Sequence, residues 1–82
     1  MTKHYFITYE EAQKVMPLAL YVSRHWKTKD VKEKAGKIYQ ELSYVRKDVD
    51  YEPLRGNQVI LSGKEAELFE GLLQIAGIEI PS

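Results

Sequence analysis

The chain has 82 residues, of which 44% are hydrophobic, and its 12 basic side chains balance its 12 acidic ones. We expect one small globular domain, residues 1–82, because the chain is too short for a (β/α)₈ barrel or a complete dinucleotide-binding fold. The absence of cysteine excludes disulfides, and no apolar run is long enough to cross a bilayer, so we expect a cytoplasmic protein without membrane contact.

The first helix is predicted to begin at Tyr9. Thr8 and Glu11 have the spacing of a capping box, in which each side chain accepts a hydrogen bond from the other residue's backbone N–H. Apolar residues then recur at helical spacing, at Ala12, Val15, Ala19, Val22 and Trp26. We therefore expect Trp26 to pack in the core. Pro17 falls on the polar stripe, where we expect it to bend the helix and not to break it.

A second helix is predicted over residues 31–49, after a turn at residues 27–29. Asp30 and Glu33 form a second capping pattern at its start. The helix has the most regular apolar periodicity in the chain, at Val31, Ala35, Ile38, Leu42, Val45 and Val49. Two apolar helix faces joined by so short a turn predict an antiparallel helical hairpin.

A third helix is predicted over residues 63–76. Ser62 and Glu65 supply a third capping pattern. The apolar face of this helix comprises Ala66, Phe69, Leu73 and Ala76. Gly77 is placed to end the helix in a left-handed conformation, with Ile78 folding back onto the last turn.

Short extended segments, Tyr5–Thr8 and Gln58–Leu61, precede the first and third helices. Residues 6–22 and 60–76 form an approximate repeat, which capping chemistry alone can produce. Alternatively, the two units are related by a pseudo-twofold axis, and their strands pair as an antiparallel ribbon; residues 78–80 are a further candidate strand. The predicted fold class is α+β, mainly helical: an antiparallel helical hairpin plus a third helix, with a short two-stranded β-ribbon.

The residues that usually carry catalysis do not converge in this sequence. His4 and His25 have no partner at metal-ligand spacing. The serines lack the context of a nucleophile elbow, and no glycine-rich run resembles a phosphate loop. We expect no enzyme activity, no metal site and no cofactor.

The charges are unevenly distributed, with a net charge of +4 in residues 1–40 and −4 in residues 41–82. Lys32 and Lys34 oppose the dipole at the start of the second helix. The candidate partner-binding residues at the hairpin turn are Arg24, His25, Lys27, Lys29, Lys32 and Lys34. Three interpretations stay open: a solvated lysine-rich turn, a surface for an acidic protein partner, or a surface for nucleic acid.

A second candidate contact patch lies toward the end of the second helix. It comprises Tyr44, Tyr51 and Arg55, together with Arg46. Partly exposed tyrosines are enriched in interfaces. Scattered amphipathic surface residues are the alternative interpretation.

These observations favour a non-catalytic protein-interaction module, such as a small adaptor or inhibitor. Self-association as a homo-oligomer belongs to the same class, because the first helix is apolar around most of its circumference. The alternative is a nucleic-acid-binding protein that uses the basic hairpin tip. The neutral overall balance of charge is unusual for such a protein.

Overall fold

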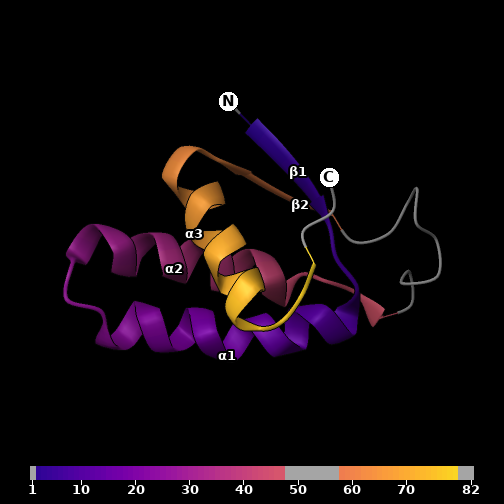
Figure 1. The fold of residues 1–82 in the computed structure, drawn as a ribbon, viewed down its shortest axis with the longest axis horizontal. Helices are drawn as coiled ribbons and strands as arrows, with labels where there is room; N and C mark the ends of the chain where they lie inside the picture. Colours follow the sequence, from indigo (N-terminus) through magenta and orange to yellow (C-terminus); the bar gives the residue numbers. More distant parts are fainter. Residues whose placement is uncertain (1, 48–57, 80–82) are drawn as a thin grey trace.

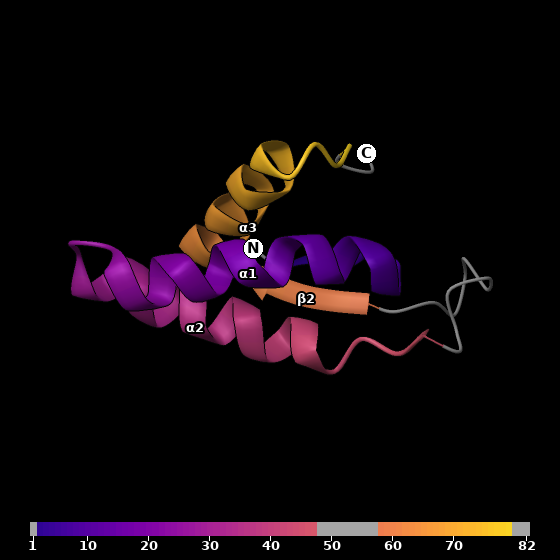
Figure 2. The ribbon, with the colours of Figure 1, turned by 90° about the horizontal axis from the view of Figure 1, so that it is seen from below.

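Three helices and two strands make up the described part of the chain. The computed structural model describes residues 2–47 and 58–79. In chain order the elements are β1 (Thr2–Phe6), α1 (Tyr9–His25), α2 (Lys29–Ser43), β2 (Gln58–Ser62) and α3 (Gly63–Ile75). Helices α1 and α2 run antiparallel side by side, and α3 lies obliquely to both (Figure 1, Figure 2). The predicted α+β fold, with a helical hairpin, a third helix and a two-stranded ribbon, is confirmed.

Helix α1 begins where the sequence predicts. The Thr8 hydroxyl accepts a hydrogen bond from the Glu11 backbone N–H at 3.1 Å, and the Glu11 carboxylate accepts one from the Thr8 N–H at 3.0 Å. These two bonds form the predicted capping box and satisfy backbone donors that the start of a helix leaves open. The helix continues without a break through Pro17, which lies on the exposed side as expected.

The core forms where the apolar faces of the three helices meet one face of the ribbon. Val15 of α1, Ile38 and Leu42 of α2, and Phe69 of α3 are its largest contributors with almost no exposed surface, together with Leu73. Burying each such side chain contributes roughly 1.5–3 kcal/mol to the free energy of folding. The periodicity in the sequence therefore identified the packed faces correctly.

The two strands pair antiparallel, with register running from Thr2 opposite Ser62 to Phe6 opposite Gln58. This confirms the antiparallel ribbon, but β1 lies three residues earlier than the predicted strand at its N-terminal end and stops before Ile7. The strand thus ends two residues before Thr8, whose N–H is bonded to the Glu11 side chain in the capping box and is not available to a ladder.

Helix α2 starts earlier and ends sooner than predicted. Its N-cap is Thr28, so Asp30 lies inside the first turn and does not cap the helix. The helix ends at Ser43 and not at residue 49, because the Tyr44 N–H already bonds the carbonyls of Glu41 and Leu42 in a tightened last turn. Val45 still packs against the core from outside the helix, while Val49 lies outside the described residues.

Helix α3 begins at the predicted residue, Gly63, and ends at Ile75, one residue before the predicted end, but its predicted cap is not formed. Ser62 is the N-cap, yet its side chain makes no capping bond, because the φ of +58° at Gly63 alters the entry to the helix and Glu65 pairs with Lys37 of α2 at 3.3 Å. The predicted third capping box is therefore wrong.

The end of α3 has the left-handed stop that the sequence predicts. Gly77 adopts a φ of +76°. Its N–H bonds the Gln74 carbonyl at 3.0 Å, and the Ile78 N–H bonds the Leu73 carbonyl at 2.9 Å, which together form a Schellman motif. Ile78 and Glu79 belong to no strand, and Ile80 lies outside the described residues.

Candidate functional site at the hairpin tip

The connection between α1 and α2 is short and projects from one end of the molecule's longest axis (Figure 1). Trp26 caps α1 in an extended conformation, with its N–H bonded to the Val22 carbonyl at 3.1 Å. Thr28 is likewise extended and precedes α2. Only three residues therefore join the helices, so the last turn of α1 and the first turns of α2 lie at one end of the hairpin. We call residues 21–34 the hairpin tip.

The side chain of Trp26 is 49% exposed, so the expectation that it packs in the core is wrong. It follows Val22, the last buried residue on the apolar face of α1, by one turn. Because the chain turns toward α2 directly after Trp26, this position lies beyond the end of the packed interface. Tyr21 is 60% exposed, and its ring lies 4.8 Å from the ring of His25, tilted by 41°. The tip thus presents three rings to solvent.

Two shallow, open hollows flank Lys27. The aromatic hollow is lined by Tyr21, His25, Trp26, Lys27 and Thr28. The lysine hollow is lined by Ser23, Lys27, Lys29, Lys32 and Glu33. Because Lys27 lines both, the two hollows adjoin, and the structure brings apolar rings and cations together on one small surface.

One of the predicted cations is already paired. The Lys34 ammonium donates to the Asp30 carboxylate at 2.5 Å. This hydrogen bond holds the pKa of Asp30 below its ordinary value of 3.8, and the charge of Lys64 contributes in the same direction. Lys64 is the first lysine of α3, so tertiary packing adds a cation to the region of the tip that no local pattern in the sequence indicated.

The remaining cations of the tip make no ion pair within residues 2–47 and 58–79; they are Arg24, Lys27, Lys29 and Lys32. Arg24 lies in the last turn of α1, where positive charge is favourable. Lys29 and Lys32 lie in the first turns of α2, where the dipole disfavours positive charge. These two lysines therefore do not serve the stability of their own helix.

The second predicted patch lies far from the tip. Tyr44 is 67% exposed and follows the last residue of α2, roughly 22 Å along the helix from Lys29. Arg46 lies nearby; it is exposed and already has an interaction partner within the protein. Tyr51 and Arg55 lie outside the described residues. Tyr44 is thus not brought together with the cations of the tip.

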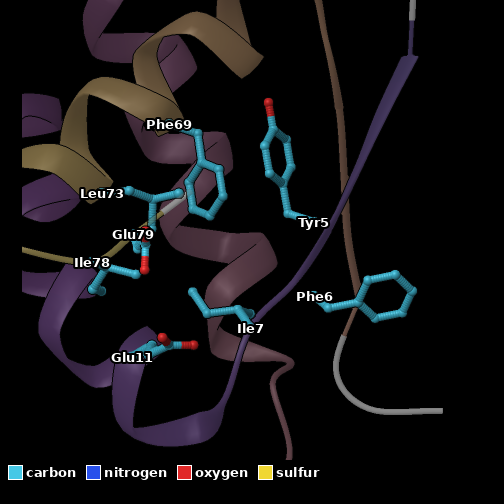
Figure 3. Close-up of a pocket in the computed structure, with 8 residues that line it drawn as sticks. All are labelled: Tyr5, Phe6, Ile7, Glu11, Phe69, Leu73, Ile78 and Glu79. Atoms are coloured by element: carbon cyan, nitrogen blue, oxygen red, sulfur yellow. The ribbon is translucent and has the colours of Figure 1, made fainter. Parts of the chain in front are cut away.

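A small cavity lies on the opposite side of the core, between β1, the start of α1 and the end of α3 (Figure 3). Its empty volume is about 270 Å³, and the rings of Tyr5 and Phe69 line it, at 4.9 Å between ring centres. The Glu11 carboxylate at its edge is used by the capping box, and the Tyr5 hydroxyl donates to Glu70. The polar groups of Glu11 and Tyr5 are therefore engaged within the fold.

The two histidines lie apart, each beside a neutral group. Nδ1 of His4 lies 2.8 Å from the amide nitrogen of Gln58, and His25 contacts the ring of Tyr21. Among the described residues, no three of His, Cys, Asp and Glu are grouped as metal ligands. None of the helices in the described ranges has the length and apolar character needed to span a membrane.

Known proteins add nothing to these observations. No family model, curated protein sequence or solved structure matches the chain.

Proposed function

We propose that this protein is a non-catalytic protein-interaction module, a small adaptor or inhibitor, that binds its partner through the hairpin tip. The observation that carries the proposal is the half-exposed Trp26, which lines one hollow together with Tyr21 and with Lys27, a cation that makes no ion pair within the described residues. Tryptophan, tyrosine and arginine are the residues that most often dominate the free energy of protein association. A large aromatic ring that is exposed at a projecting turn offers a partner a large apolar area to bury.

The charge of the tip favours an acidic partner. Lys27, Lys29 and Lys32 surround the lysine hollow, which has a single carboxylate, that of Glu33, in its lining. Charge complementarity of this kind raises the rate of association and selects against basic partners. The absence of cysteine is compatible with a reducing compartment, so we place the module in the cytoplasm.

The proposal is tested by capturing partners from an extract of cells that express the protein, with cross-linking. Wild type, Trp26→Ala and Tyr44→Ala are immobilised in parallel, since both residues are exposed and only Trp26 lies at the tip. We expect one protein to be retained by wild type and Tyr44→Ala and lost with Trp26→Ala. Recovery of no protein, or equal recovery by all three, would overturn the proposal.

Nucleic-acid binding is the second candidate function. Lysines that make no ion pair within the described residues, beside exposed rings, also suit phosphates and stacked bases, which supports this alternative. It predicts retention on DNA or RNA that falls steeply as salt rises, with a smaller slope after Lys27→Gln. Retention that does not depend on salt would rule this candidate out.

Self-association is compatible with the proposed function. Phe6 and Ile60 are 47% and 49% exposed, and Ile75 is 72% exposed, so apolar surface is available outside the tip. Self-association requires that such side chains form a contiguous apolar patch, because apolar side chains exposed singly are common on monomeric proteins. Light scattering over a range of concentrations tests this directly, and a monomer at the highest concentration would exclude it.

A further inference from the structure

The two hollows at the hairpin tip suit two different chemical groups. The aromatic hollow has the rings of Tyr21 and Trp26 in its lining, and the lysine hollow has three ammonium groups. Because Lys27 separates them and lines both, a single short ligand reaches the two together. An extended peptide rises about 3.3 Å per residue, so a segment of a few residues is long enough to contact both hollows.

Resting on the proposed function, we infer that the tip recognises an acidic segment of a partner protein that carries one large apolar side chain beside its carboxylates. The apolar side chain enters the aromatic hollow and covers Trp26. The carboxylates face Lys27, Lys29 and Lys32, which have no ion pair elsewhere in the described chain. Neither contact alone defines the ligand, because the rings give affinity and the lysines give orientation and selection by charge.

Two features favour a peptide over a nucleic acid. The Tyr21 ring is tilted by 41° against His25 at 4.8 Å, so these rings pack on each other and do not offer a row of parallel faces for successive bases. Glu33 lies in the lining of the lysine hollow. A peptide backbone is uncharged and has N–H groups that can donate to this carboxylate while the acidic side chains turn toward the lysines, whereas the phosphodiester backbone of DNA has no donor and is charged at every linkage.

Trp26 provides a direct probe, because it is the single tryptophan of the chain. Wild type is titrated with an eight-residue peptide of aspartate and glutamate with a leucine at its centre, and with a matched peptide that has glycine there. Neither peptide contains tryptophan or tyrosine. We expect the leucine peptide to shift the emission of Trp26 to shorter wavelength and to bind about tenfold or more tightly than the glycine peptide, because leucine buries a large apolar surface.

Variants separate the two hollows. With Trp26→Ala, anisotropy of a dye-labelled leucine peptide should show its affinity falling to that of the glycine peptide. The double variant Lys29→Gln, Lys32→Gln should weaken both peptides by about fivefold and reduce their salt dependence. Lys14 is an exposed lysine in the first half of α1, and Lys14→Gln serves as the matched control. It should change neither the affinity of the two peptides nor their salt dependence. Circular dichroism checks that each variant is folded.

The outcomes distinguish this inference from the proposed function. Equal binding of the leucine and glycine peptides, or no binding of either at millimolar concentration, overturns the inference. The proposed function is decided separately by the capture experiment, which does not depend on the peptide chosen. A shift of Trp26 emission with a single-stranded oligonucleotide or with vesicles of anionic lipid, but with neither peptide, overturns the inference and assigns the tip to that ligand.

Discussion

The hydroxyl of Tyr5 connects β1 to α3 and gives a sharp test of the packing. The Tyr5 residue is 4% exposed, its ring meets Phe69 edge to face at 4.9 Å, and its hydroxyl donates to the Glu70 carboxylate, which Lys3 also contacts at 3.1 Å. Tyr5→Phe keeps the ring and its contacts and removes only the hydroxyl. The difference in unfolding free energy between the two proteins therefore isolates this hydrogen bond.

A hydrogen bond to a charged group contributes about 1.5–3 kcal/mol to stability. Glu70 is partly exposed, with 26% of its side chain accessible, and keeps its contact with Lys3 in the variant. The free energy lost with the hydrogen bond of the Tyr5 hydroxyl therefore falls at the lower end of that range. We expect Tyr5→Phe to lower the free energy of unfolding by about 1.5 kcal/mol at pH 7, measured by urea denaturation followed by circular dichroism.

The pH dependence supplies an independent signature. Burial, and then the bond to Glu70, raise the pKa of Tyr5 above its ordinary value of 10.0. The unfolded chain therefore releases this proton first, and wild type loses up to about 1.4 kcal/mol per pH unit above pH 10 that the Phe variant does not lose. The other titrating groups are shared, so the two stability curves should converge as the pH rises.

At acidic pH the dependence of stability on pH has the opposite sign, because stability is lost as the pH falls. The bonds from Tyr5 and then from Lys3 hold the pKa of Glu70 below its ordinary value of 4.5. The stabilisation that Glu70 provides is present above pH 4.5 and is lost as the pH falls through its lower folded-state pKa. Removing the Tyr5 hydroxyl should make stability less sensitive to acid. Parallel curves of unfolding free energy against pH for wild type and Tyr5→Phe, at both acidic and alkaline pH, would refute this account of the contact. Equal stability of the two proteins at pH 7 would also refute it.

Three further predictions are tested by urea denaturation, two of them with paired variants and the third, Lys29→Glu, also by peptide titration. Thr8→Ala should cost about 1 kcal/mol, whereas Ser62→Ala should cost less than about 0.5 kcal/mol, because only Thr8 makes a side-chain capping bond. Gly36→Ala should stabilise α2 by about 1 kcal/mol, since its new Cβ would meet the nearest side chain at 4.0 Å, whereas Gly77→Ala should destabilise by about 1 kcal/mol because of its φ of +76°. Lys29→Glu should stabilise by about 0.3–1 kcal/mol by matching the dipole of α2, while weakening the binding of an acidic peptide.

Each pair has a result that contradicts its reasoning. Equal costs for Thr8→Ala and Ser62→Ala would mean that the observed capping bonds do not contribute. Destabilisation by Gly36→Ala would mean that the helices of the hairpin are too close for a methyl group. Loss of stability with Lys29→Glu, or unchanged peptide affinity, would mean that this lysine serves the fold and not a partner.

The cations of the candidate site were predictable because most of them lie next to one another in sequence. Lys27 lies in the short turn, with Arg24 and Lys29 in the helix ends on either side of it, and any antiparallel hairpin places such a turn at its tip. The exposure of Trp26 was not predictable, since its spacing is that of a buried position and only the end of the helix–helix contact leaves it uncovered. Lys64 comes from a helix that begins 34 residues after Lys29, and no local rule connects the two.

The sequence by itself determined the features that depend on residues within one or two turns of each other. The Thr8 cap, the stop at Gly77 and the buried faces of the helices follow from helical spacing and from backbone hydrogen bonding, which act over three to five residues. Tertiary structure decided what depends on distant partners. Glu65 pairs with Lys37 of α2 and does not form the predicted capping box of α3. Trp26 is exposed because the contact between α1 and α2 ends before it. Contacts of this kind are specified by the whole packed arrangement, and a local pattern contains no information about them.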